Sequence, residues 1–574
     1  MTDVNQLITE HLDIWTAATE KKSSAGRGNG GGISQYGVSK LRQLITELAV
    51  RGSLVPQIDA DGNANQQLIE VAADKRRALK QGQIKGVRGL VEESGRLGFG
   101  VPEKWATVRL DSIAWPQAGF AFKSKGFNTM GTGLPLIRIR DVGKEFSGTF
   151  FAGDHRTEFV VENGDYLISM DGEFRVCPWT NGPALLNQRV SRLVFFSELV
   201  SPKFVSLALQ FELSALQGVK AYTTVDHLST KQIANASLPF PPLAEQHRIV
   251  DKVDELMALC DALERQAEDS LKAHQTLVET CLATLTNSQS AEDFTQNWTR
   301  TEAHFDTLFT TKESVQALEA AIVELGVTGL LVPQSEADEP ATQLLQRVAK
   351  DIAAYSKLNK VRPVKPTKIS KQESPAERLP AGWVETRLSS LFRVVTDGDH
   401  QAPPRASDGV AFLTIGNISS GQLNFEGCRR VPDDYYKGLP VYRTPGLGDI
   451  LYTVVGATYG RPVLVETEEQ FCVQRHIAIL RPSVELDVDY LVWMLKSAWV
   501  YNQAREGITG SAQPTLALKP LRNFLVLLPP RAQQKRISSK IKQLHQLTAR
   551  LRESISVSTE TQVSLADTLT SNIH

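Results

Sequence analysis

Asp397-Gly398-Asp399-His400 is a short stretch whose residue types could serve catalysis. Two carboxylates beside an imidazole can bind a metal ion or exchange protons with a substrate. The same residues suit a turn, because Asp side chains bond to nearby backbone, Gly398 permits a tight bend, and Pro403-Pro404 follows. We expect the turn, on a loop that faces a binding partner, with the metal or acid–base site as the alternative.

Other catalytic motifs are missing from the sequence. There is no GxxxxGK[ST] loop for the phosphates of ATP, no GxSxG, no HExxH, and no Asn/Asp-Pro-Pro-Tyr/Phe tetrapeptide of amino-methyltransferases. The five cysteines form no CxxC pair, and no Cys/His set has zinc spacing. We therefore expect no catalytic residue, no metal and no cofactor on this chain.

Bulk properties set the class of protein. The chain has 574 residues, enough for several domains, and a net charge of −1, which leaves room for a local basic face. Scattered cysteines predict a reduced, cytoplasmic protein. No apolar run has membrane-spanning length and the N-terminus is no signal peptide.

A long helix is predicted from Pro241 to Leu285. After Pro241-Pro242, which suit a helix start, no Pro or Gly occurs, and apolar or small residues recur at alternating steps of 4 and 3. Such a helix would be about 65 Å long at about 1.5 Å per residue, and its narrow stripe needs a partner. The stripe consists of Ile249, Val253, Leu256, Cys260, Leu263, Ala267, Ser270, His274, Leu277 and Cys281.

The same pattern returns 288 residues later. Pro529-Pro530-Arg531-Ala532-Gln533-Gln534-Lys535-Arg536-Ile537 repeats the first helix start. We expect the two long helices to pack on each other, with two independent surface helices as the alternative. The second stripe continues through Ile537, Ile541, Leu544, Thr548, Leu551 and Ile555.

The repeat extends over the whole chain. Leu331-Val332-Pro333-Gln334 matches Leu54-Val55-Pro56-Gln57, Trp383 answers Trp105, Gly448-Asp449 answers Gly164-Asp165, and Gln474-Arg475 answers Gln188-Arg189. The predicted fold is α+β, with two α+β domains separated by two long antiparallel coiled-coil helices and an internal pseudo-twofold repeat. The predicted parts are 1–38, a helical extension and Gly-rich linker; 39–100, a helical framework; 101–242, the first α+β domain; 243–286, a long helix; 287–378, a connector and second framework; 379–530, the second α+β domain; and 531–574, a second long helix.

These landmarks resemble the specificity subunit of Type I restriction–modification enzymes. The resemblance rests most of all on the helix starts at Leu238–Ile249 and Leu527–Ile537. It rests also on the segments that begin the two α+β domains, Val101–Trp105 and Leu379–Trp383, and on Asp397–His400, Gly448–Leu451 and Thr509–Gln513. It covers residues 39 to 574 and leaves residues 1 to 38 outside. The first domain departs from it, since Ala221–Val225 stands where the second has Gly510–Pro514.

The resemblance implies a non-catalytic DNA-binding subunit. Each α+β domain would be a target recognition domain that reads one half of a split DNA site, and the long helices would set the gap and dock two modification subunits. Those methyltransferase subunits would carry S-adenosylmethionine, and restriction (motor–nuclease) subunits would carry ATP and Mg. A helical adaptor that bridges proteins without reading DNA is the rival reading.

Reading base edges needs bidentate donors, and phosphates need Lys, Arg and hydroxyl donors. For any single Arg the alternative is a solvated surface charge, and for Arg189 and Arg475 it is a framework role. The candidates are Lys123, Lys125, Arg138, Arg140, Arg175, Gln188, Arg189, Tyr222 and Thr223 in the first domain, and His400, Arg405, Asn417, Arg429, Tyr459, Arg461, Gln474, Arg475, Ser511, Gln513 and Thr515 in the second.

Overall fold

The protein is described by a computed structural model that covers residues 10–21, 33–81, 96–220, 227–371, 373, 379–401, 403–510 and 513–571. It mixes helix and sheet, as the sequence predicts. The chain divides into two compact units, Met1–Asp269 with Thr559–His574, and Ser270–Ser558. None of the helices in the described ranges is both long enough and apolar enough to cross a membrane.

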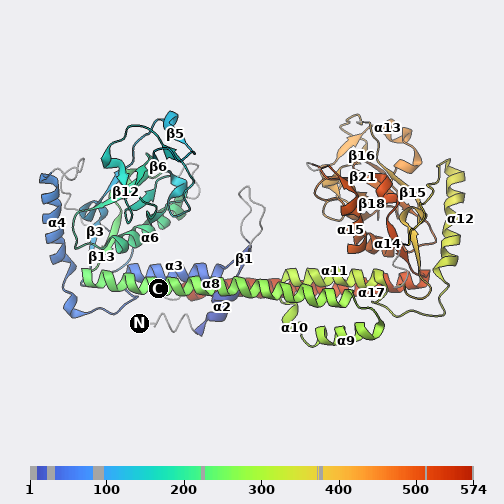
Figure 1. Ribbon diagram of the computed structural model, residues 1–574, viewed down its shortest axis with the longest axis horizontal. Helices are drawn as coiled ribbons and strands as arrows, with labels where there is room; N and C mark the ends of the chain where they lie inside the picture. The colour runs from blue at the N-terminus through green and yellow to red at the C-terminus, as the bar shows by residue number, and fades with distance from the viewer. Residues whose placement is uncertain are drawn as a thin grey trace. The chain divides into compact units, whose positions relative to one another are not determined.

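The first unit joins framework helices to a two-sheet domain. One sheet has the strand order β10-β9-β12-β4, and the other has the order β5-β7-β6-β11-β8. Helix α6 lies between these sheets and the helices α3 and α8 (Figure 1). The elements are α2 (Leu12–Ala17), α3 (Tyr36–Arg51), α4 (Ala64–Lys80), β3 (Ala106–Arg109), α5 (Leu110–Ile113), β4 (Ala114–Ala118), β5 (Phe127–Asn128), β6 (Leu134–Ile137), β7 (Phe150–Phe151), β8 (Val160–Val161), β9 (Tyr166–Ser169), β10 (Val176–Pro178), β11 (Ala184–Leu186), β12 (Val190–Phe195), α6 (Pro202–Lys220), α7 (Thr230–Ala234), β13 (Ser237–Phe240) and the first part of α8 (Leu243–Thr286).

The second unit repeats the four-stranded sheet, but its other sheet has three strands where the first unit has five. Its four-stranded sheet has the order β15-β21-β18-β19, and a three-stranded sheet has the order β17-β16-β20. Helix α13 lies at the end of this domain that is remote from α11 and α17 (Figure 1). The elements are the last part of α8, α9 (Ala291–Glu302), α10 (Phe305–Leu308), α11 (Lys312–Thr328), α12 (Ala341–Asn359), β14 (Val384–Arg387), β15 (Phe392–Asp397), β16 (Val410–Leu413), β17 (Arg429–Val431), α13 (Asp433–Gly438), β18 (Ile450–Thr453), β19 (Pro462–Leu464), β20 (Phe471–Val473), β21 (Ile477–Pro482), α14 (Val488–Lys496), α15 (Ala498–Gly507), β22 (Ile508–Thr509), β23 (Thr515–Leu516), α16 (Leu518–Arg522), β24 (Leu525–Leu528) and the first part of α17 (Arg531–Ser571), whose end belongs to the first unit.

In each unit, the chain enters and leaves the α+β domain through two strands that pair with each other. In the first, β3 pairs with β13 and Ala106 lies opposite Phe240. In the second, β14 pairs with β24 and Val384 lies opposite Leu528. A Pro-Pro step then starts the long helix in both cases. The two ends of each domain are therefore side by side, at the start of a long helix.

The start of each long helix packs in a bundle with the short framework helix. In the first unit, Ile249, Leu256 and Cys260 are buried with Leu41 and Ile45 of α3. In the second unit, Ile537 and Ile541 of α17 are buried with residues of α11. Gly326 of α11 makes this approach possible, because a Cβ there would lie 2.8 Å from the Cδ1 atom of Ile541. The short helices thus supply partner surface that the sequence analysis did not assign to them.

Two predicted stripe residues, Ser270 and Leu277, are exposed. Leu277 is 54% exposed, whereas its neighbour Val278 is 2% exposed and is buried with Leu282 and Leu285. A straight helix drifts by about 20° per heptad, so four heptads after Ile249 the drift approaches the angle between successive residues. The buried stripe therefore moves forward by one residue. Val253 and Leu263 are buried, while Leu544, Leu551 and Ile555 are partly buried.

Paired polar side chains in the first turn of each long helix join that helix to its surroundings. Gln246 donates to the carbonyl oxygen of Pro241 at 2.8 Å and accepts from the Ser201 N–H at 2.8 Å. Gln534 makes the same contacts with Pro529 and Asp487, each at 2.9 Å. The preceding side chains contact the framework turn: Glu245 accepts from Gln57 at 2.6 Å, and Gln533 donates to the Val332 carbonyl at 3.1 Å.

Glycines end α3 and α11 against the entry to each α+β domain. Gly52 has φ +75° and Gly329 has φ +83°, which is the left-handed conformation that glycine adopts most readily. A Cβ on Gly329 would lie 2.5 Å from Pro380 and 3.1 Å from Trp383. A Cβ on Gly52 would meet Pro102 and Trp105 in the same way. This explains why the Gly and the Pro-x-x-Trp landmarks recur together.

Gly329→Ala should destabilise the second unit by about 1–3 kcal/mol more than Gly448→Ala, because it adds overpacking to the cost of the left-handed backbone. Gly448 is the matched control, with φ +84° and no neighbouring atom within 4 Å of an added Cβ. Denaturant unfolding of the full chain measures both. Equal losses of stability would show that the helix end does not pack tightly on the domain entry.

Candidate nucleic-acid interface

Loops of both sheets meet at one edge of each α+β domain, here called the loop edge. In the first domain, β6 and β11 run parallel with Ile137 opposite Leu186, so Arg138 and Gln188 follow at the same end. In the second, β16 and β20 run parallel with Leu413 opposite Val473, so Asn417 and Gln474 also follow at one end. Parallel pairing thus brings together segments that are about 50 residues or more apart in sequence.

The turn of a hairpin also lies at the loop edge of each domain. A Ser or Thr hydroxyl forms hydrogen bonds across this turn. Ser169 donates to the Glu173 carbonyl at 2.6 Å and accepts from the Arg175 N–H at 2.8 Å. Thr453 donates to the Thr458 carbonyl at 2.5 Å and accepts from the Arg461 N–H at 3.1 Å. Arg175 and Arg461 therefore occupy equivalent positions. Neither hydroxyl was among the predicted residues, although each lies five residues after the glycine of a matched Gly-Asp pair.

The structure corrects the alignment of the adjoining turn by one residue. The Val190 N–H bonds to the Asn187 carbonyl, and the Ile477 N–H bonds to the Gln474 carbonyl. Asn187 therefore corresponds to Gln474, and Arg189 corresponds to His476 rather than to Arg475. The identical Gln-Arg dipeptides suggested the earlier match, but the strand register sets the true one.

A glycine lets a neighbouring loop cross this turn closely. A Cβ on Gly119 would lie 2.1 Å from the Asn187 carbonyl oxygen, and one on Gly398 would lie 2.0 Å from the Val473 carbonyl oxygen. Neither distance can accommodate a side chain, so both positions need glycine. These crossings hold the Asp397–His400 segment against the Gln474 turn.

The Asp397–His400 segment forms the expected turn. Asp399 accepts hydrogen bonds from Tyr435 and Arg443, each at 3.0 Å, and His400 contacts Asp397 at 3.0 Å. Burial opposes ionisation of Asp399, but hydrogen bonds from Tyr435 and the backbone, with the charge of Arg443, lower its pKa overall. Within the described ranges no three His, Cys, Asp or Glu side chains gather as metal ligands.

Two arginines of the first loop edge, Arg175 and Arg189, are paired with carboxylates. Arg189 approaches Asp171 at 3.4 Å and the Nδ1 atom of His227 at 3.1 Å. His227 and Asp171 are 2.5 Å apart, and Arg175 pairs with Glu173. Asp171 and His227 were not among the predicted residues, because they become neighbours of Arg189 only through an isolated bridge between their backbones.

At the hairpin and the turn of the second loop edge, the contacts are aromatic or made to neutral groups. Tyr459 stacks on Tyr501 with ring centroids 5.6 Å apart and an interplanar angle of 7°. Arg461 donates to the Ser419 carbonyl at 2.8 Å, and the Nε of Arg475 donates to the Nε2 of His476 at 3.3 Å. Burial, and then Arg475, lower the pKa of His476, so this imidazole is neutral at pH 7.

Not every predicted residue has a free side chain at the loop edge. Asn417 is committed to its own turn, since it accepts from Thr414 and donates to the Asn424 carbonyl. Thr515 donates to the Gln513 carbonyl at 3.1 Å. Arg405 and Arg429 lie beside or on β17, which β16 separates from β20. Lys123 and Lys125 lie just before β5, at the far side of their sheet.

The remaining candidates are open to solvent or undescribed. Arg140, Gln188 and Gln513 are exposed, Arg138 is half-buried, and no described residue is hydrogen-bonded to any of these four side chains. Gln474 is half-buried beside Asp399, to which its backbone is bridged. Tyr222, Thr223 and Ser511 lie outside the described residues.

Comparison with known proteins identifies the family. The family model of the Type I restriction modification DNA specificity domain matches residues 102–273. The specificity subunit of the Type I restriction enzyme EcoAI of Escherichia coli is 33% identical over 99% of both chains. The corresponding EcoEI subunit of Escherichia coli is also 33% identical over 99% of both chains.

A solved structure is also similar. The HsdS subunit from Thermoanaerobacter tengcongensis aligns with 82% of this chain and 97% of its own, at 18% identity and a TM-score of 0.38. The sequence matches correct one expectation: they cover 99% of the chain, so most of residues 1–38 lies inside the similarity and not outside it. Trp15 of that region is fully buried in the core around α3. The chain belongs to the family of DNA specificity subunits of Type I restriction enzymes, which recognise DNA and are not catalytic.

Proposed function

We propose that each α+β domain reads one half of a bipartite DNA site through its loop edge. One observation carries this proposal: the two domains share the order of the four-stranded sheet, the hairpin hydroxyl and the turn, yet present different side chains at the same edge. A common framework with different polar groups suits two different base sequences, because bases are distinguished by their hydrogen-bond patterns in the major groove.

The side chains at the loop edge suit DNA in two ways. Gln188 and Gln513 are exposed amides that can bond adenine through two atoms, and Arg138, Arg140 and Arg461 can do so with guanine. Lysines and the other arginines can neutralise phosphates, which gives affinity without sequence information.

The long helices are proposed as the spacer and the docking surface. By residue assignment, α8 begins in the first unit and ends in the second, whereas α17 does the opposite. This supports an antiparallel coiled coil and a pseudo-twofold repeat. Exposed apolar side chains on both helices, Leu259 and Leu277 on α8 and Leu547 and Val557 on α17, support the docking of other subunits.

We also propose how the chemistry is distributed among the subunits. Two modification subunits would bind S-adenosylmethionine and methylate the DNA, and restriction subunits would bind ATP and Mg, while this chain carries no cofactor. All five cysteines are free, which is consistent with the reducing cytoplasm. A helical adaptor without DNA reading is the rival, and filter binding of random duplex across a salt series separates the two.

The proposed function is tested by exchanging residues 103–240 for the equivalent domain of a relative. The paired entry and exit strands make this segment a cassette, so only one half-site should change. Sequencing of the methylated bases made by the assembled enzyme measures the outcome. A change in both half-sites would contradict independent reading.

Gly398→Ala should weaken recognition of one half-site, because its Cβ would push the Asp397–His400 turn away from the Gln474 turn. A loss of about 1–3 kcal/mol at base pairs of that half-site is expected, with the other half-site unchanged. Gly416→Ala is the control, since its nearest neighbour would be 3.8 Å away. Competition binding with single-base variants measures both, and identical profiles for the two proteins would count against the assignment.

Seven residues inserted after Leu263 and after Leu551 should lengthen the preferred gap. One heptad keeps the stripe in phase and adds about 10 Å, or roughly three base pairs of DNA length. Methylation of a library that varies only in gap length measures the effect. An unchanged gap in a folded, active variant would show that the helices do not set the spacing.

A further inference from the structure

We propose that residues 357–371 form a second DNA-binding element, which contacts phosphates next to the half-site read by the second domain. This segment, called the basic strap, comprises the end of α12 and the extended chain that follows it. The proposal rests on the proposed function, and it adds a phosphate site that lies outside the loop edge.

The basic strap concentrates positive charge. Residues 352–372 contain no Asp or Glu, whereas the strap carries Lys357, Lys360, Arg362, Lys365, Lys368 and Lys371. All six side chains are exposed, and none forms an ion pair with a described residue. From residue 361 to 370 the chain has no helix or strand, and Pro363 and Pro366 limit its conformations.

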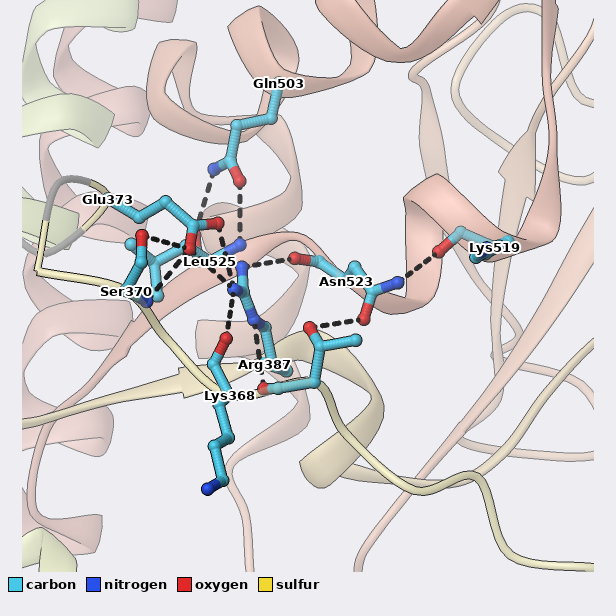
Figure 2. Close-up of polar contacts among 9 residues, drawn as sticks. Lys368, Ser370, Glu373, Arg387, Gln503, Lys519, Asn523 and Leu525 are labelled. Carbon is cyan, nitrogen blue, oxygen red and sulfur yellow. Dashed lines mark hydrogen bonds and ion pairs between the residues drawn. The ribbon is translucent and has the colours of Figure 1, made fainter.

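A buried arginine holds the strap in place. The Arg387 side chain is 6% exposed and its guanidinium reaches both the strap and the domain (Figure 2). It donates to the Lys368 carbonyl at 3.1 Å, to the Asn523 carbonyl at 2.9 Å and to Glu373 at 2.9 Å. The Thr367 hydroxyl donates to the Asn523 side chain at 3.0 Å. The backbone of the strap is bonded, while the Lys368 side chain points away from the cluster (Figure 2).

Glu373 completes this anchor. Its carboxylate accepts from the Ser370 N–H at 3.0 Å and from the Ser370 hydroxyl at 2.8 Å. These two bonds, with Arg387, lower the pKa of Glu373 to about 2. A lowered folded-state pKa favours the folded state above the unfolded pKa, and the benefit is lost as the pH falls through about 2. The anchor is therefore charged at any physiological pH.

Ordering such a segment costs conformational entropy, and a binding role of the ordered form would explain that cost. A Lys- and Pro-rich linker needs no buried anchor to span its two ends, because water solvates it well. Holding it with its lysines outward instead creates a preformed row of cations. Preformed groups bind a ligand with a smaller loss of conformational entropy, and a row of lysines matches a row of phosphates.

The place of the anchor indicates DNA as the ligand. Asn523 follows α16, which itself follows Thr515 at the loop edge. Five helical residues and three extended ones separate Thr515 from Asn523 by at most about 18 Å. This is about five base pairs along a duplex. Exposed Lys519 lies between them on α16, so positive charge continues from the loop edge toward the strap.

The test compares two triple variants of the full chain with equal changes of charge. K365Q/K368Q/K371Q removes three cations from the strap. K272Q/K540Q/R550Q removes three exposed cations from α8 and α17 that have no ion-pair partner among the described residues. Binding is measured by fluorescence anisotropy for the target duplex and for random duplex between 50 and 200 mM salt, about the range in which phosphate contacts dominate the change. Arg461→Ala serves as a base-reading comparison.

The strap variant should reduce the slope of log affinity against log salt by about three, one for each lysine, and equally for both duplexes. The helix variant should keep the wild-type slope. A wild-type slope in the strap variant, or the same reduction in both variants, would overturn the strap proposal. If the wild-type chain does not prefer its target over random duplex, the proposed function itself fails.

Lysine acetylation followed by mass spectrometry gives an independent readout. A bound target duplex should protect Lys365, Lys368 and Lys371 at least threefold from acetylation, while Lys540 reacts at an unchanged rate. Equal reaction of the strap lysines with and without DNA, under conditions where the duplex is bound, would overturn the proposal.

Discussion

The rest of the fold depends on two adjacent polar side chains buried in the first turn of each long helix. Gln246 and Gln534 are fully buried, and each shares its amide between the Pro-Pro step and the start of a helix in the α+β domain. A buried amide left without partners costs about 1–3 kcal/mol, so this geometry is enforced. The neighbouring Glu245 is 1% exposed and bonds Gln57 of the framework turn. Burial raises the pKa of Glu245, so the bond from Gln57 helps to compensate for an unfavourable position. One helical turn thus positions three elements at once.

This junction frees the remainder of each α+β domain to vary. The entry strand pairs with the exit strand beside the junction, and the glycine that ends the short helix packs on the entry tryptophan. Stability is therefore concentrated at the base of the domain, among side chains that recur in both halves. The loops at the far ends of the strands carry few of these restraints. A difference of side chains at the loop edge leaves the junction unchanged, which is what two recognition modules on one scaffold require.

The sequence predicted the two long helices because each leaves a local signal. Steps of 4 and 3 after Pro-Pro predict α8 and α17, and the Gly and Trp landmarks recur 277 and 278 residues later. The sequence-based predictions failed where small changes of helix phase add up, and where residues far apart in sequence come into contact. Leu277 lies four heptads after Ile249, where the drift of the buried stripe has accumulated. The match of Arg189 to Arg475 was based on identical residues, whereas strand register sets the true correspondence. The partners of Arg189 come from a loop and a bridge that only the fold brings together, so no pattern around Arg189 reveals Asp171 or His227. The contacts of Arg387 were not predicted either, because its partners are also brought together only by the fold.

The arginines at the hairpin and turn of the two loop edges differ in their partners, and this affects what each can do. In the first domain, Arg175 and Arg189 face Glu173 and Asp171, which hold the guanidinium groups in place and cancel part of their field. In the second, Arg461 donates to a backbone carbonyl and Arg475 to a neutral imidazole, so both keep their full charge. Attraction to phosphate depends on net charge, whereas a bidentate contact with a base depends on orientation. The partners of Arg175 and Arg189 therefore favour a fixed orientation, whereas Arg461 and Arg475 keep their full attraction for phosphate. The basic strap adds further exposed cations to the second unit, outside its loop edge.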